Sequence, residues 1–365
     1  MKRFLCLMLV TLFFCSCSGA KLGDGKVLFK NEEEKFLTHA VFYNDAGDVA
    51  CLYTDEDEYY ITAKNNDGAD KVLYTLPENS YAYELYAKNG IIAFYERQIY
   101  VNRDERCILK VIDTENGEVY TPFSKVIVFE TYDVQSRFID ISGRDVYYVT
   151  SSFALEETRI MKYTVGDKEP SEFATVPMTE NEFTFNHSVT CMDIYGDKLV
   201  AATVEGYDTH ISIYNLKTGE AEKKKLLPIN VGVVYSVAYN SDDNIGLYYQ
   251  TVDKEGKFEA DIVGFIGVND EEITPLYTLS ENEYVNRETV YLDGDILSFN
   301  IQLAMNDDET VSYDDFYGLM FNIKNEKSAR IGGSLLTFAK DGKLYDLVFD
   351  KEDAHTISFI ETKVN

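Results

Sequence analysis

The chain of 365 residues contains no tryptophan, only four histidines and six cysteines, and fewer basic than acidic residues. Without tryptophan it cannot carry the WD signature, the tryptophan docking motif of quinoprotein dehydrogenases or the tryptophan-ended Asp-box of sialidases. Nucleophile elbows, HExxH, P-loops and GxGxxG are also missing. No recognisable catalytic constellation remains, so we predict a binding protein rather than an enzyme.

The cysteines are too sparse for a disulfide framework or a CxxC metal site. Beyond Cys17, the remaining three, Cys51, Cys107 and Cys191, lie among apolar neighbours and are expected to be buried thiols. His39 and His187 precede or begin predicted innermost strands near the axis, and two histidines do not make a zinc site. We therefore predict no metal site and no cofactor. One alternative stays open, a Ca²⁺ ion at the acidic turn 65–70.

The first residues have the layout of a secretory signal. Lys2 and Arg3 precede an apolar run at 4–14, which is too short to span a bilayer as a helix. The end of this run resembles the lipobox of bacterial lipoproteins, with Ser16 as the small residue before Cys17. The resemblance implies a signal peptide at 1–16, lipidation of Cys17 and a tether at 17–25. Phe14 departs from the aliphatic residue that the family prefers, and secretion after cleavage at 18–20 is the alternative.

Lipidation would place the protein on the bacterial cell envelope, at the outer membrane or the outer leaflet of the cytoplasmic membrane. Removing Lys2 and Arg3 leaves 32 of the 34 basic residues against 63 acidic ones, a formal charge of −31. Such a field repels nucleic acid and attracts cations or basic partners. Nucleic-acid binding is therefore excluded from the expected functions.

Short runs rich in Val, Ile, Tyr, Phe and Thr alternate with Gly, Asn and Asp turns along the whole chain, which predicts an all-β protein. One turn type recurs at intervals of 43 to 53 residues. Its seven markers are Gly47, Gly90, Gly143, Gly196, Asp243, Gly294 and Gly342. A second turn follows each of the first six markers by about 25 residues. A unit holding two hairpins predicts a four-stranded antiparallel blade, and seven units predict a seven-bladed β-propeller over 26–365.

The last unit lacks an outer strand, whereas a strand-like run at 26–30 is left over before the first unit. Pairing the two closes the ring and covers an open edge. This closure resembles the "velcro" of WD-repeat propellers. The outer turns DTENGEVY and NLKTGEAE also resemble the D-x-x-T-G-E turns of bacterial quinoprotein-like propellers. These resemblances imply an architecture and no particular chemistry.

A motif recurs at every second predicted blade junction, as PENSY (77–81), TENEF (179–183) and SENEY (280–284). The connections lie on the face where propellers usually place ligands, so the copies are predicted to ring one opening together with His187 and Arg287. There carboxylates would accept hydrogen bonds and aromatic rings would stack. The predicted ligand-binding residues are Glu78, Asn79, Tyr81, Glu180, Asn181, Phe183, His187, Glu281, Asn282, Tyr284 and Arg287. The competing interpretation is turn chemistry retained by blade duplication.

Two functions follow as hypotheses. The first is an envelope-anchored lipoprotein whose propeller binds or scaffolds a protein, peptide or glycan partner. The second is a glycoside hydrolase or lyase with paired carboxylates such as Glu180 and Glu281 at the channel mouth. The distance between two acids that face one cavity distinguishes them.

Overall fold

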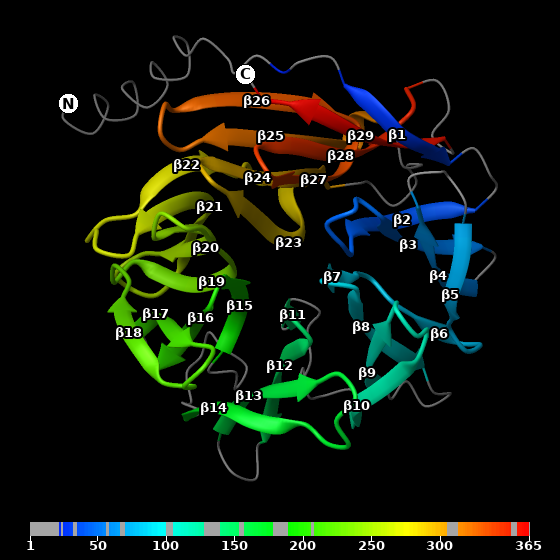
Figure 1. Cartoon of the computed structure of the whole chain (residues 1–365). Coiled ribbons are helices and arrows are strands. Elements are labelled where there is room, and N and C mark those ends of the chain that lie inside the picture. The colour runs from blue at the N-terminus through cyan, green and yellow to red at the C-terminus, as the bar shows by residue number, and fades with distance from the viewer. Residues whose placement is uncertain are drawn as a thin grey trace.

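The structure is a computed structural model of the whole chain, and it confirms the predicted ring of seven antiparallel blades around a central channel (Figure 1). The residues that the structure describes are 22, 25–31, 35–55, 58–65, 70–99, 105–127, 139–152, 157–177, 189–205, 208–304, 313–351 and 356–364. Cys17 and the predicted signal peptide lie outside them. Among the described residues, no helix is long and apolar enough to cross a membrane.

The first four blades follow the chain from the inner to the outer strand. Blade 1 consists of β2 (Phe36–Phe42), β3 (Val49–Asp55), β4 (Glu58–Lys64) and β5 (Asp70–Thr75). Blade 2 consists of β6 (Ser80–Tyr81), β7 (Tyr86–Lys88), β8 (Ile91–Ile99), β9 (Glu105–Asp113) and β10 (Val119–Ile127). Blade 3 consists of β11 (Ile139–Ser142), β12 (Asp145–Ser152), β13 (Glu157–Thr164) and β14 (Ser171–Pro177). Blade 4 consists of β15 (Val189–Tyr195), β16 (Lys198–Glu205), β17 (Asp208–Asn215) and β18 (Ala221–Leu226).

The other three blades include the closure of the ring. Blade 5 consists of β19 (Val231–Tyr239), β20 (Asn244–Val252), β21 (Phe258–Gly267) and β22 (Thr274–Thr278). Blade 6 consists of β23 (Glu283–Asp293), β24 (Ile296–Leu303), β25 (Phe316–Asn322) and β26 (Lys327–Gly332), with a 3-10 turn at Tyr313–Asp315. Blade 7 consists of β27 (Ser334–Lys340), β28 (Lys343–Phe349), β29 (Ile357–Lys363) and β1 (Lys26–Asn31).

The predicted closure is confirmed by β1, which pairs antiparallel with β29 from Lys26 opposite Glu361 to Asn31 opposite Ile357. Leu22 adds an isolated bridge to Val364. The boundary between blade 7 and blade 1 is called the seam below. Aromatic rings fill its core: Phe42 lies 4.7 Å from Tyr345 and 5.7 Å from Phe359, centroid to centroid. The chain ends are therefore held by both backbone pairing and apolar burial.

All seven predicted turn markers lie between the first and second strands of their blades, and all have positive φ angles, from 52° at Gly294 to 86° at Gly47. Asp243, the one marker that is not glycine, has a φ of 58°. Left-handed backbone is open to glycine and tolerated by aspartate and asparagine, which explains the residue types that made the repeat visible.

The innermost strands are joined around the channel by polar side chains. In four of the seven blades, a side chain on the inner strand accepts a hydrogen bond from a backbone N–H of the next blade's inner segment. These pairs are His39 with Leu85 (3.3 Å), Asp140 with Ile194 (2.5 Å), Asp193 with Tyr239 (2.7 Å) and Ser236 with Val290 (3.1 Å). Inner strands otherwise present an unpaired edge to the channel, and these bonds satisfy part of it.

Cys51, Cys107 and Cys191 are buried free thiols, as predicted. Burial raises the pKa of Cys51 to about 12, so this thiol is unreactive at neutral pH. His39 lines the channel as expected, and His210 lies on the third strand of blade 4, away from it. His187 lies outside the described residues.

Candidate functional site

The first and third copies of the repeated motif form equivalent turns. The N–H of Ser80 donates to the carbonyl of Pro77 (3.1 Å), and the N–H of Glu283 donates to that of Ser280 (3.0 Å). The backbone carbonyl of the central asparagine accepts a hydrogen bond from the end of the next blade's second strand, from Ile99 (3.1 Å) or Ala304 (2.8 Å). These two bonds fix how the chain passes from one blade to the next.

A further copy, missed in the sequence, lies between blades 4 and 5. The N–H of Val231 donates to the carbonyl of Pro228 (2.9 Å), and that of Val252 donates to the carbonyl of Asn230 (2.9 Å). Here Ile229 replaces glutamate, so a search for Glu-Asn pairs passes over it. The sequence pattern that identifies it is Leu-x-x-Asn, in which any two residues separate the leucine from the asparagine. The feature that these three turns share is a backbone geometry with asparagine at the same place, as expected of turn chemistry.

The predicted side chains of the first copy lie on the surface. Glu78 and Asn79 are exposed, and Tyr81 is half-buried with its ring 5.0 Å from that of Tyr83. The three residues line an open depression of about 810 Å³ between blades 1 and 2. This depression contains no residue of the third copy.

The predicted side chains of the third copy are also exposed. Glu281 and Asn282 face solvent, Tyr284 is 54% exposed, and the Oδ1 of Asn282 accepts a hydrogen bond from the Ser280 hydroxyl (3.0 Å). Glu180, Asn181, Phe183 and His187 lie outside the described residues, as does the side chain of Arg287, whose backbone belongs to β23. A common opening ringed by all three copies therefore stays a prediction.

Beside these turns the structure reveals carboxylates that the sequence reasoning did not single out. Glu283 accepts hydrogen bonds from the hydroxyls of Tyr277 (2.9 Å) and Tyr317 and from the N–H of Ser280 (2.9 Å). Burial alone would raise the pKa of Glu283, but these bonds outweigh it and lower the pKa. Tyr74 makes the equivalent contact to the fully buried Glu96 (2.5 Å).

The signal for these contacts is a longer repeat. Residues 73–81 read LYTLPENSY and residues 276–284 read LYTLSENEY, so the tyrosines that reach Glu96 and Glu283 occupy the same place in both. These carboxylates lie between blades and accept hydrogen bonds from tyrosines on the outermost strand of the preceding blade. They act as structural anchors of the junctions.

The central channel holds the most perturbed acids among the described residues that line a cavity. Asp140 and Asp193 both line its cavity of about 260 Å³, with Lys88 nearby. Burial and the charge of Asp193 raise the pKa of Asp140 to about 7, and burial also raises the pKa of Asp193. The two buried carboxyls therefore interact electrostatically, and the raised pKa of each favours its protonated form.

Each carboxyl of this pair accepts a backbone N–H bond from the next blade. Their geometry therefore serves the ring. Within the described ranges, no group of three or more His, Cys, Asp or Glu is placed to hold a metal ion.

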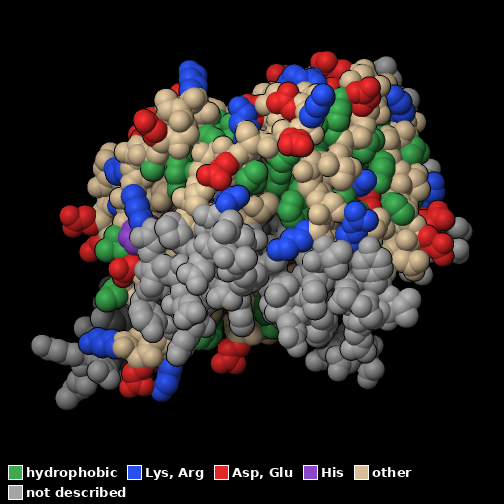
Figure 2. Space-filling model, turned by 90° about the horizontal axis from the view of Figure 1, so that it is seen from below, with side chains coloured by type: hydrophobic (Ala, Val, Ile, Leu, Met, Phe, Trp, Pro, Cys, Tyr) green, Lys and Arg blue, Asp and Glu red, His purple; other side chains and the backbone are tan. Residues whose placement is uncertain are grey.

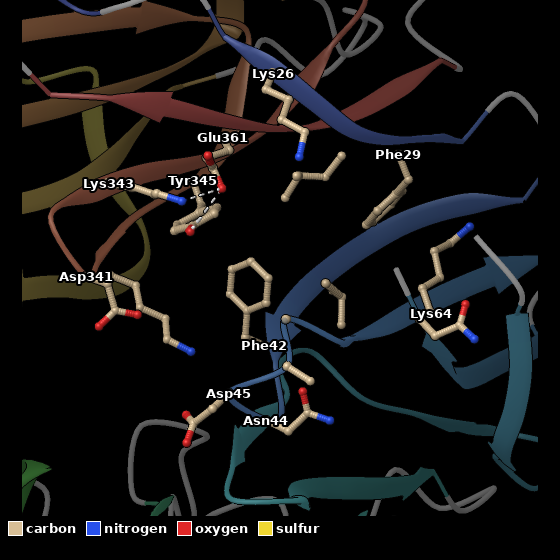
Figure 3. Close-up of a pocket in the computed structure, with 16 residues that line it drawn as sticks. Lys26, Phe29, Phe42, Asn44, Asp45, Lys64, Asp341, Lys343, Tyr345 and Glu361 are labelled. Carbon is tan, nitrogen blue, oxygen red and sulfur yellow. Dashed lines mark hydrogen bonds and ion pairs between the residues drawn. The ribbon is translucent and has the colours of Figure 1, made fainter. Parts of the chain in front are cut away.

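Another cavity of about 810 Å³, larger than the channel cavity and equal in volume to the depression between blades 1 and 2, opens at the seam, and we call it the seam cavity (Figure 3). Three elements form it: the closing strand β1, the first turn of blade 1 at 44–47, and the first turn of blade 7 at 340–343. Its apolar lining includes Phe29 from β1, Phe42 at the end of β2 and Tyr345 on β28. Both turns are tight because Gly47 and Gly342 adopt positive φ angles of 86° and 70°.

Charged side chains surround this apolar lining. Lysines 26, 64, 340 and 343 make up four of its sixteen residues, against the acids Asp45, Asp341 and Glu361. Lys343 pairs with Glu361 (3.0 Å), which also accepts a hydrogen bond from the Tyr345 hydroxyl (3.4 Å). Burial and Glu361 raise the pKa of Tyr345 to about 12, so its hydroxyl stays a donor at neutral pH. Elsewhere on the described surface, seen from the edge of the ring, charges of both signs are interspersed (Figure 2).

Comparisons with known proteins agree with the fold. The chain is similar to the hydrazine synthase of Kuenenia stuttgartiensis, with a TM-score of 0.55, 12% identity, and coverage of 92% of this chain and 98% of that chain. It is similar to an oligogalacturonate lyase from Vibrio parahaemolyticus, with a TM-score of 0.51, 8% identity, and coverage of 95% and 99%. For an acylaminoacyl peptidase from Pyrococcus horikoshii the values are 0.51, 14%, 86% and 49%.

At these identities the likeness shows the β-propeller fold alone. No protein-family model matches the chain, and no curated protein matches it in sequence. The function therefore has to be argued from the site.

Proposed function

We propose that the chain is a non-enzymatic binding propeller, tethered to the bacterial envelope, which takes its ligand in the seam cavity. One observation carries the proposal: the cavity of about 810 Å³ combines an apolar lining with charged groups from both sides of the seam. Binding sites for small ligands are typically concave, about 300 to 1,000 Å³ in volume, and lined by apolar side chains with a few polar groups. The seam cavity has these properties, whereas the channel, at about 260 Å³, is smaller.

The partner is a peptide or a glycan rather than a folded protein. A recess between two turns accommodates a narrow, flexible molecule, whereas a stable protein interface requires about 800 Å² on each partner. The formal charge of −29 for the chain also argues against nucleic acid as the partner.

The tether is proposed from the sequence before Gly25. The apolar run at 4–14 and the Ser16-Cys17 pair support acylation of Cys17. Cys17→Ser should move the protein from the membrane fraction to the soluble fraction of cells, whereas Cys15→Ser should leave it in the membrane. Equal partitioning of the two variants would contradict the tether.

Binding in the seam cavity is tested by hydrogen–deuterium exchange. A panel of oligosaccharides and short acidic, neutral and basic peptides is screened for a shift in melting temperature, and each hit is mapped by exchange. We expect slower exchange in segments 26–31, 42–49 and 340–345. Protection confined to the turns at 77–81 and 280–284 would place the ligand at the repeated motif and overturn the seam assignment. Mass spectrometry of the ligand after incubation shows whether it is returned unchanged, as expected of a binding protein.

A hydrolase or lyase stays the second candidate because of one observation, the buried pair Asp140 and Asp193 beside a cavity. Turnover of a glycan that is abolished by Asp140→Asn would favour it. Release of cleaved product by wild type, and not by the variant, is the result that would replace the binding proposal.

A further inference from the structure

The chemical class of the ligand follows from the lysines of the seam cavity, and this step rests on the proposed function. We propose that the seam cavity binds an acidic oligosaccharide through the carboxylates of its sugar units. Over the whole chain, acidic residues outnumber basic ones 63 to 34. Around this cavity the balance is reversed, with four lysines against three acids. The acidic excess of the whole chain is therefore absent at this cavity, so an anion meets less repulsion there.

Two of the lysines are available for a ligand. Lys343 is paired with Glu361 (3.0 Å) and Lys64 with Asp70 (3.0 Å). No carboxylate of the described residues lies within ion-pair distance of Lys26 or Lys340. Lys26 belongs to β1 and Lys340 to the end of β27, so they come from two of the three elements that form the cavity.

Aromatic rings hold two of the ammonium groups in place. Lys340 Nζ lies 5.0 Å from the centre of the Phe42 ring, and Lys64 Nζ lies 4.8 Å from the centre of the Phe29 ring. Cation–π contacts of this kind position a charge without neutralising it. Figure 3 shows the Lys26 side chain extending from β1 into the space between the strand and Phe42. The cavity therefore presents the positive charges of Lys26 and Lys340 from two different strands.

The remaining groups favour a sugar over a peptide. Asp45 and Asp341 supply acceptors for hydroxyl groups, while the amide of Asn44 is already hydrogen-bonded to Asp48. An acidic peptide offers carboxylates and amides but few hydroxyls for the two aspartates to bind. A chain of uronate units carries one carboxylate and several hydroxyls per unit. It can satisfy the lysines and the aspartates together.

The probe is a mannuronate trisaccharide, with its methyl ester as the matched neutral ligand. Isothermal titration should show binding of the acid that weakens as salt is added, and binding of the ester at least roughly tenfold weaker, since a charged contact contributes more than a neutral one. Lys26→Met and Lys340→Met should each weaken binding of the acid roughly tenfold. Lys257→Met, at a lysine on the turn of blade 5 that is 74% exposed, is the control and should leave it unchanged.

The two proposals fail in different ways. If acid and ester bind equally at the seam, and the lysine variants match Lys257→Met, the anionic class is overturned and the binding function stands. If exchange measurements show no ligand of the panel at the seam, the proposed function itself is overturned. A trimer of glutamate that binds at the seam more tightly than the trisaccharide overturns the choice of sugar over peptide. Because Lys26→Met lies on the closing strand, its melting temperature is measured first, and Lys340→Met tests the same charge without touching β1.

Discussion

Replacing Asp346 with asparagine should make the stability of the protein less dependent on pH. Asp346 lies on β28, is 2% exposed, and accepts hydrogen bonds from the hydroxyls of Thr337 (2.7 Å) and Ser334 (3.4 Å). Asn300 of blade 6 donates to both of these residues, so the cluster joins blades 6 and 7. Burial raises the pKa of Asp346 from 3.8 to about 7, against the opposing effect of the two hydroxyl donors.

The magnitude follows from this pKa. Since each pKa unit corresponds to about 1.4 kcal/mol, protonation of Asp346 contributes about 4 kcal/mol at the acidic limit. Because the folded pKa lies above the unfolded one, the native state binds the proton more tightly. The contribution is fully present below about pH 4, falls by about 1.4 kcal/mol per pH unit, and is lost once the pH passes about 7.

The assay is urea denaturation at several pH values from about 4 to 8, followed by tyrosine fluorescence because the chain has no tryptophan. The quantity compared is the difference in unfolding free energy between wild type and Asp346→Asn. This difference, wild type minus variant, should decrease by about 4 kcal/mol from the acidic to the alkaline end of the range, so the variant becomes relatively more stable at high pH. Any cost of the substitution that does not depend on pH cancels from the slope of the difference against pH. A difference independent of pH, or one that grows with pH, would refute the reasoning.

Three further predictions concern the stability and reactivity of the propeller. Phe29→Ala should lower the unfolding free energy by roughly 2 kcal/mol, because the Phe29 side chain packs on Phe359 at 5.4 Å, and by less than a fully buried phenylalanine would, because Phe29 is half-buried. The control in chemical denaturation is Phe258→Ala, at a residue that is 59% exposed. Gly143→Ala should cost about 1 kcal/mol and Gly143→Asn less, because φ is 59° and no atom lies within 4 Å of an added Cβ; equal melting temperatures would contradict a backbone cause. Native protein should not react with a thiol reagent at Cys51 at neutral pH, and reaction should require unfolding, since the thiol is buried and its pKa is about 12.

The fold could be predicted from the sequence because the first turn of each blade contains a recognisable residue type. A reversal between two paired strands needs left-handed backbone, and glycine or aspartate at that point is visible in the sequence at all seven places. The closing strand was visible as a surplus run at one end and a missing strand at the other. The sequence does not indicate that the inner strand of blade 2 is divided into β6 and β7, because this division depends on contacts such as that of Leu85 with His39 in another blade.

The site was harder to predict for a physical reason. The repeated motif marks the turns between blades, and a repeated turn and a repeated binding site give the same sequence pattern. The residues that form the seam cavity lie at opposite ends of the chain, Lys26 on β1 and Lys340 on β27, and are brought together only by ring closure. Nothing in either segment alone indicates a cavity, since each lysine by itself reads as a solvated surface residue.

The most direct test of the central claim is a crystal structure of the propeller grown with the mannuronate trisaccharide. We expect the sugar in the seam cavity, between β1 and the turn at 340–343, with a carboxylate oxygen within hydrogen-bond distance of the Nζ of Lys26 or Lys340. A sugar bound instead beside Asp140 and Asp193 in the channel, or against the turns at 77–81 and 280–284, would contradict it.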